Sequence, residues 1–141
     1  MNKKYDIIVV GGGPTGSMAA MTAAKLGASV CVLEKTRDIG SPVRCGEAVG
    51  HGGLVQFMQP KSNWIASKIM SIKLVSPNSK EVDINFSKET GYILNRKVFD
   101  YDLSKMSVDC GANVFTKAYV KDLIIENDYV KGVDVDFIDK K

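Results

Sequence analysis

Three glycines and a glutamate near the N-terminus have the types and the spacing of a nucleotide site. Gly11, Gly13 and Gly16 satisfy the pattern G-x-G-x-x-G, and Glu34 follows about 20 residues later. Such a turn lets a pyrophosphate approach the backbone, where the N-terminus of the next helix favours negative charge. A carboxylate at the end of the following strand accepts hydrogen bonds from ribose hydroxyls and repels a 2′-phosphate. The spacing therefore predicts a dinucleotide site that does not hold NADP.

The residues around these glycines predict the strand–helix–strand unit that must position them. Residues 5–10 contain an unbroken run of β-branched side chains, which favours a strand buried on both faces. A helix is expected over 14–26, followed by a second strand at 29–34. With a third strand at 113–117, the expected sheet is parallel, in the order 113–117, 29–34, 5–10.

The rest of the chain predicts a glycine-rich loop and several antiparallel strands. Residues 39–53 form the loop, with one helical turn near 47–49. The other expected elements are a short helix at 54–57, a strand at 68–75 paired with an amphipathic strand at 81–86 that has one solvent-facing side, a strand at 92–94, a helix at 97–110, and a hairpin of 118–126 with 130–138.

Composition excludes several classes of function. The chain has 141 residues, 45% of them hydrophobic and 25% charged, which is typical of a soluble globular domain. A net charge of +3 without a basic block does not favour nucleic acid as a partner. Three scattered cysteines and one histidine do not suit a zinc site. The first apolar run is too short to span a bilayer and lacks a signal-peptide layout, so a cytoplasmic location is expected.

Two later segments resemble the geranylgeranyl reductase family of FAD-dependent oxidoreductases, which have the p-hydroxybenzoate hydroxylase fold. Residues 40–47 read G-S-P-V-R-C-G-E and are similar to the family's P-x-R-C-G-E segment. Residues 91–100 read G-Y-I-L-N-R-K-V-F-D and are similar to its G-Y-x-x-x-R-x-x-F-D stretch. The opening, residues 6–35, resembles the FAD-binding start that many flavoenzymes of this fold share.

The resemblance implies an FAD enzyme that saturates double bonds of geranylgeranyl chains in lipids. It implies an isoprenoid lipid as substrate, an electron donor of unknown identity, and peripheral contact of the full-length protein with a membrane. Cys45 is the candidate catalytic residue, facing the flavin ring or the alkene; the alternative is a structural thiol. His51 is expected to be a surface imidazole. The expected FAD-binding residues are Gly11, Gly13, Pro14, Thr15, Gly16, Glu34, Lys35, Arg44, Cys45, Gly46, Arg96 and Val120.

The expected architecture is an α/β, Rossmann-like FAD-binding domain over residues 1–141, with a parallel sheet and antiparallel β-hairpins. Residues 68–94 are expected to form a β-hairpin insertion toward the substrate side. The family's Gly-Asp-Ala motif and its later aromatic motif ending in Phe-Pro do not occur in the sequence. The chain is therefore expected to be a truncated N-terminal part that is inactive alone and leaves one edge of the strand at 5–10 open.

Two alternative functions stay open at this point. The first is an FAD-dependent monooxygenase of the same fold, which would consume oxygen together with its substrate. The second is a nucleotide-binding fragment without catalysis. A purified protein that carries FAD and loses it on dialysis would indicate this alternative.

Overall fold

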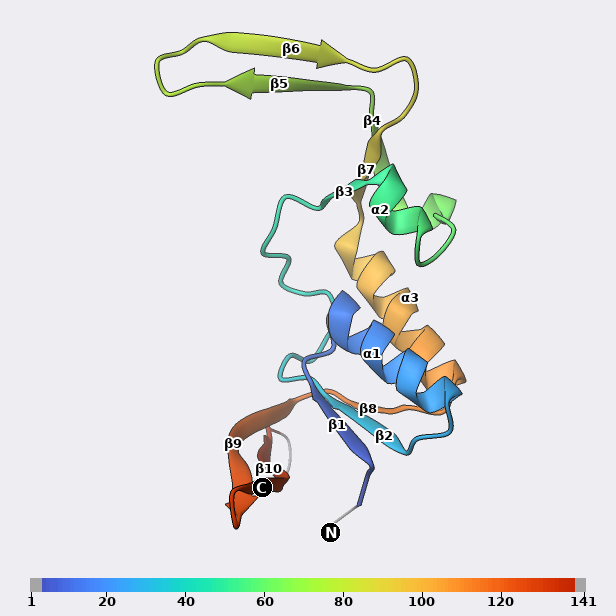
Figure 1. Cartoon of the computed structure of the whole chain (residues 1–141), viewed down its shortest axis with the longest axis vertical. Helices are drawn as coiled ribbons and strands as arrows, with labels where there is room; N and C mark the ends of the chain where they lie inside the picture. The colour runs from blue at the N-terminus through green and yellow to red at the C-terminus, as the bar shows by residue number, and fades with distance from the viewer. Residues whose placement is uncertain (1–3, 139–141) are drawn as a thin grey trace. The chain divides into compact units, whose positions relative to one another are not determined.

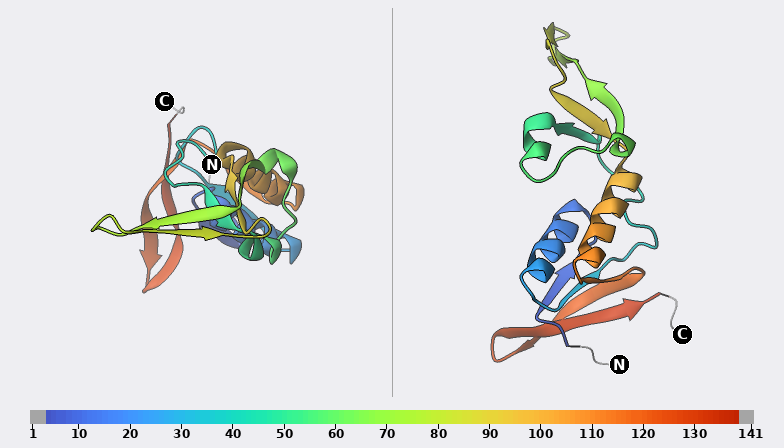
Figure 2. Two further views of the ribbon diagram at one scale, coloured as in Figure 1. Left: turned by 90° about the horizontal axis from the view of Figure 1, so that it is seen from above. Right: turned by 90° about the vertical axis from the view of Figure 1, so that its right-hand side faces the viewer.

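The computed structural model describes residues 4–138, which fold as two compact units. One unit combines the residues up to Pro42 with those from Asp100 onward, and the other spans Val43–Phe99. Figure 1 and Figure 2 show the elements of both units. The single domain expected from the sequence stays a prediction. Within residues 4–138, no helix is long and apolar enough to cross a membrane.

The first unit is built on a three-stranded parallel sheet. β1 (Ile7–Val10) pairs with β2 (Val30–Leu33), and β2 pairs with β8 (Asn113–Phe115). The order β8-β2-β1 and the parallel direction of both pairs confirm the expected topology. Between β1 and β2 runs α1 (Pro14–Lys25), which is followed by Gly27 at a φ of 92°.

The central strand β2 is buried on both faces because each face has its own cover. Val30 and Val32 pack against Ala20 of α1 and against Ala112. Cys31 and Leu33, which point the other way, pack against the hairpin of β9 (Ala118–Glu126) and β10 (Tyr129–Phe137). In Figure 1 and Figure 2, α1 and the later turns of α3 (Arg96–Asp109) lie on one side of the sheet and this hairpin on the other.

The edge strand β1 corrects one expectation and confirms another. Ile7 and Val10 are 40% and 59% exposed, so the predicted burial on both faces is wrong for this strand. Among the described residues β1 pairs only with β2, which confirms the expected open edge. An unbroken apolar run therefore marks a central strand correctly at β2, but at β1 it leaves apolar surface exposed.

The second unit is built on a small antiparallel sheet. β7 (Gly91–Leu94) is its central strand, between β3 (Ala48–Gly50) and β4 (Ile65–Ile69). The two helical segments before β4 are α2 (His51–Val55) and a single 3-10 turn (Ser62–Trp64). Trp64 is buried and meets Phe99 edge to face, with ring centroids 5.1 Å apart. The aromatic pair anchors the first turn of α3 to the sheet.

A separate hairpin extends from this unit with both strands exposed. β5 (Ser71–Val75) pairs with β6 (Glu81–Asn85), as expected, although neither strand has a buried side. One face is apolar through the cross-strand pairs Ile72–Ile84 and Leu74–Val82. The other face is polar and carries the ion pair of Lys73 with Glu81 at 2.6 Å. The predicted amphipathic pattern is thus present without the predicted burial.

Three local predictions in this unit were wrong, two of them for the same physical reason. The helical turn near 47–49 is instead strand β3, because it pairs with the distant strand β7. The predicted strand at 68–75 is two strands, because 65–69 pair with β7 and 71–75 pair with β6. The helix expected at 54–57 begins earlier, at His51. In the first two cases a long-range partner overrides local propensity.

The turn before α1 yields a stability prediction. A Cβ at Gly16 would lie 2.0 Å from the carbonyl oxygen of Gly11, a backbone atom that cannot move aside. We expect Gly16→Ala to lower the free energy of unfolding by about 3 kcal/mol or more, measured by urea denaturation followed by circular dichroism. The control is Gly53→Ala in α2, where an added Cβ meets nothing within 4 Å and stability should hold or rise slightly. Equal urea midpoints for Gly16→Ala and the wild type would contradict this account.

Candidate functional site

The glycine turn is shaped by backbone geometry that the sequence dictates. Gly11 follows β1 at a φ of 102°, a conformation that side chains disfavour, and its N–H donates to the carbonyl of Leu33 at 2.8 Å. Gly13 is the N-cap of α1, and Pro14 fills the first helical position, where the missing N–H is not needed. The chain thus leaves β1, turns sharply and enters the helix within a few residues.

The N-terminus of α1 is open in the way that a phosphate site requires. Within residues 4–138, no side chain caps this helix, and its first turn carries no acid that would repel an anion. A Cβ built on Gly13 meets no atom within 4 Å, so the space beside the turn is free. The helix end therefore presents N–H donors and a partial positive charge to open space. These residues fit the pyrophosphate of a dinucleotide.

Glu34 is hydrogen-bonded to both sides of the turn. Its Oε2 accepts from the N–H of Gly12 at 2.8 Å, and its Oε1 accepts from the N–H and the hydroxyl of Thr36 at 2.8 and 2.9 Å. The carboxylate thus ties the end of β2 to the glycine turn, a role that the sequence did not predict. Because a carboxylate has about four acceptor positions, it can still accept from a ribose hydroxyl.

These contacts keep Glu34 ionised. Partial burial raises the pKa of its carboxyl group, but the hydrogen bonds from Thr36 and Gly12 and the nearby charge of Lys35 lower it more, so the net pKa lies below its usual value of 4.5. The group therefore carries its negative charge at neutral pH, as the discrimination against a 2′-phosphate requires.

In the second unit, the two family-like segments meet at a cysteine and an arginine. Arg96 Nη1 donates to Cys45 Sγ at 3.0 Å, and the backbone N–H of Glu47 donates to the same sulfur at 3.4 Å. Glu47 also accepts through its carbonyl from the N–H of Leu94 at 2.9 Å. Residues 40–47 and 91–100 are thus held together, although about 50 positions separate Cys45 from Arg96.

The remaining predicted residues occupy different surroundings. Lys35, Arg44 and Gly46 are exposed. Val120 packs in the core beside Cys31 and Leu33. The structure therefore groups the glycines with Glu34 in one unit, and Cys45 with Arg96 in the other. That these two sets share one cofactor stays a prediction.

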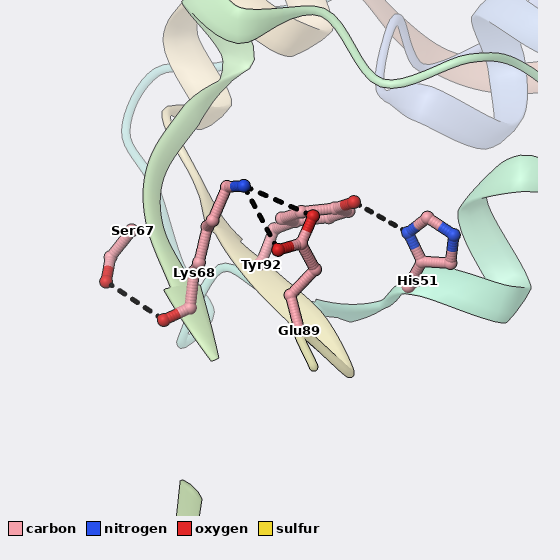
Figure 3. Close-up of polar contacts among 5 residues, drawn as sticks. All are labelled: His51, Ser67, Lys68, Glu89 and Tyr92. Carbon is pink, nitrogen blue, oxygen red and sulfur yellow. Dashed lines mark hydrogen bonds and ion pairs between the residues drawn. The ribbon is translucent and has the colours of Figure 1, made fainter. Parts of the chain in front are cut away.

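His51 differs from its expectation. Figure 3 shows its ring directed at Tyr92, and Nδ1 lies 2.6 Å from the buried Tyr92 hydroxyl. The imidazole is half-buried rather than a plain surface group. Nearby, Lys68 pairs with Glu89 at 3.1 Å (Figure 3). Sequence reasoning missed the partner because 41 positions separate His51 from Tyr92, and only the pairing of β3 with β7 brings them close.

Comparison with protein families gives one match over nearly the whole chain. A family model described as "FAD dependent oxidoreductase" matches residues 6–139.

Individual curated proteins show a more specific similarity than the family model does. The chain is 44% identical to a digeranylgeranylglycerophospholipid reductase of Methanocella arvoryzae, over 94% of this chain and 35% of that protein. It is also 44% identical to digeranylgeranylglycerophospholipid reductase 1 of Methanococcoides burtonii, over 96% of this chain and 34% of that protein. The chain thus spans about a third of the length of these relatives. The expected resemblance to the geranylgeranyl reductases is confirmed.

Solved structures agree with this fold. A geranylgeranyl bacteriochlorophyll reductase-like protein from Thermoplasma acidophilum superposes with a TM-score of 0.87 at 36% identity, over 96% of this chain and 36% of that one. The myxobacterial chondrochloren halogenase, an FAD-dependent enzyme, superposes with a TM-score of 0.71 at 24% identity, over 93% of this chain and 32% of that one, which supports the fold alone. The expected α/β FAD-binding fold is confirmed.

Glu34 yields a pH-dependent prediction. Because its pKa is lower in the folded chain, its stabilising contribution is complete above its usual value of 4.5 and is lost as the pH falls through the folded value. We expect Glu34→Gln to cost about 1 kcal/mol of unfolding free energy at neutral pH and progressively less as the pH falls below 4.5. Urea titrations of both proteins across this range measure the difference.

The control for this experiment is Glu81→Gln on the exposed hairpin. Both side chains of its ion pair with Lys73 are exposed to solvent. The substitution should therefore change the free energy of unfolding by less than about 0.5 kcal/mol across the same pH range. A difference between wild type and Glu34→Gln that stays constant with pH would refute the assigned role of the ionised carboxylate.

Proposed function

The chain belongs to the FAD-dependent oxidoreductase family, and on that premise we propose that it is the flavin-binding part of a reductase that saturates geranylgeranyl double bonds in lipids. The observation that carries this proposal is the identity of 44% over 94% of the chain with a digeranylgeranylglycerophospholipid reductase. Two motif-like segments, at 40–47 and 91–100, support it because they converge on one contact between Cys45 and Arg96. We assign the reduction of the lipid to a protein that has the full length of those relatives.

FAD is the cofactor of this family, and when bound it supplies the electron-transfer chemistry. The chain's own part is to hold and orient it. We assign the pyrophosphate to the N-terminus of α1 around Gly13, Pro14 and Thr15, with Gly11 and Gly16 shaping the turn. We assign a ribose hydroxyl to Glu34, whose oxygens retain free acceptor positions.

Arg44, Gly46 and Arg96 are proposed to contact the ribityl or phosphate part of the cofactor. A guanidinium group suits this role because it presents a fork of donors to phosphate oxygens. Cys45 is proposed to face the flavin ring or the alkene, with its sulfur oriented by Arg96. Lys35 and Val120 are assigned to the margin of the adenosine site.

The proposed substrate is an isoprenoid lipid, reduced with electrons from a donor whose identity the chain does not specify. Such a substrate resides in a membrane, so we propose a cytoplasmic protein in peripheral contact with lipid.

The free space at Gly13 yields a binding prediction. An added Cβ meets no protein atom within 4 Å and the backbone φ is −70°, so Gly13→Ala should still fold, at a cost of about 1 kcal/mol or less for alanine at this N-cap. The same methyl group would occupy the approach of the pyrophosphate, so FAD affinity should fall by about tenfold or more. Fluorescence titration with FAD, beside a thermal melt of each protein, separates the two effects. Unchanged FAD affinity in a folded Gly13→Ala protein would remove the pyrophosphate from this site.

The proposed activity can be tested in a chimera. The matching N-terminal third of the Methanocella arvoryzae reductase is replaced by this chain, and the product is incubated with FAD, a strong reductant and a digeranylgeranyl phospholipid. Saturation, measured as two added hydrogens per double bond, is the expected result. An FAD-loaded chimera that leaves the lipid unchanged would contradict the proposal.

In this chimera, Cys45→Ser should slow lipid reduction while leaving the absorption spectrum of bound FAD nearly unchanged. The matched control is Cys110→Ser, a cysteine at the end of α3 outside the proposed site. An unchanged rate of lipid reduction in Cys45→Ser would contradict the proposed catalytic role of Cys45 and leave it a structural thiol.

A further inference from the structure

Glu47 has a backbone conformation that its residue type does not favour. Its φ is 60°, in the left-handed region that glycine tolerates and a glutamate adopts only at a cost. Among residues 4–138, four glycines and five other residues have a positive φ, and Glu47 is one of those five. An outlier that persists in this way needs contacts that hold it.

Those contacts run in two directions from the one residue. Through its side chain, Glu47 Oε1 accepts from the backbone N–H of Arg96 at 3.3 Å, at the first residue of α3. The first turn of α3 has no acid of its own, so Glu47 supplies the carboxylate that a helix N-terminus favours. Through its main chain, Glu47 donates to Cys45 Sγ at 3.4 Å.

Both sets of contacts lead to the sulfur of Cys45. The carboxylate of Glu47 accepts from the backbone N–H of Arg96, and the guanidinium of Arg96 donates to Cys45 Sγ at 3.0 Å. Cys45 is exposed, so this geometry sets the orientation of an accessible thiol. We propose that Glu47 is a positioning residue that holds the Cys45 thiol and the Arg96 guanidinium against each other through its carboxylate and its left-handed backbone. The inference deepens the proposed function, on which the use of this thiol rests.

The proposal has a chemical consequence that needs neither FAD nor lipid. The N–H of Glu47 and the guanidinium of Arg96 hold the Cys45 sulfur in one exposed orientation, in which a reagent can reach it. The rate at which Cys45 of the 141-residue chain is alkylated by iodoacetamide therefore reports whether the donors are in place. Mass spectrometry of the peptides separates Cys45 from the buried Cys31 and the half-buried Cys110, which serve as internal references.

The test compares substitutions that separate positioning from helix capping. Glu47→Gly removes the carboxylate and also relieves the left-handed backbone, so stability should change little while Cys45 alkylation slows by about threefold to tenfold. Glu47→Ala should slow alkylation equally but also lower stability. Arg96→Ala should slow alkylation by a similar factor, and the Glu47→Ala, Arg96→Ala double variant by no more than the stronger single one, because both act through one contact.

The matched control is Glu89→Gln, which removes a carboxylate charge in the same unit, where Glu89 pairs with Lys68 at 3.1 Å. It should leave the alkylation rate of Cys45 unchanged. Wild-type alkylation rates in Glu47→Gly and Glu47→Ala would reduce Glu47 to a helix cap and overturn the proposal. Additive slowing in the double variant would also overturn it. Either result would leave the proposed flavin and lipid chemistry open, because the assay contains neither.

Discussion

The approach of Gly16 to the carbonyl oxygen of Gly11 is the constraint on which the first unit depends. A Cβ would lie 2.0 Å from that oxygen, so only glycine lets α1 start so close to the end of β1. This closeness brings Ala20 of α1 onto Val30 and Val32 of the sheet, where a buried cluster forms on one face of β2. The same geometry leaves the helix N-terminus beside open space at Gly13. The packing of α1 on the sheet and the open space at its N-terminus therefore both depend on one backbone contact.

Glu34 links that turn to the sheet by a second route. Its carboxylate receives the N–H of Gly12 from one side and Thr36 from the other, so the turn is braced before any ligand arrives. A braced site loses less conformational entropy when it binds, which favours affinity. The acid thus has a structural role, and a substitution there would affect this role together with the proposed recognition of a ribose.

The second unit differs from the first, because its candidate site residues come from segments far apart in the chain. β7 is the element that unites them: it pairs with β3 after the cysteine loop and leads directly into Arg96 at the start of α3. Gly91 makes the pairing possible, since a Cβ there would lie 2.5 Å from the carbonyl oxygen of Val49. The contact of Cys45 with Arg96 and that of His51 with Tyr92 both depend on this strand.

The sequence by itself determined the parallel strands, the helix between them and the glycine turn. These follow from local causes: β-branched runs, a glycine that must be left-handed, and a proline at the first helical position. By resemblance it also proposed Cys45 and Arg96 as site residues, and their roles stay predictions.

Only the tertiary structure decided what these residues touch. Nothing local shows that residues 48–50 pair with β7, that Ile7 and Val10 stay exposed at an edge, or that Glu47 reaches Arg96. Each of these depends on a partner tens of positions away or on a missing neighbour in the sheet. Local pattern fixes the conformation of a segment, whereas its burial and its contacts are properties of the assembled sheet.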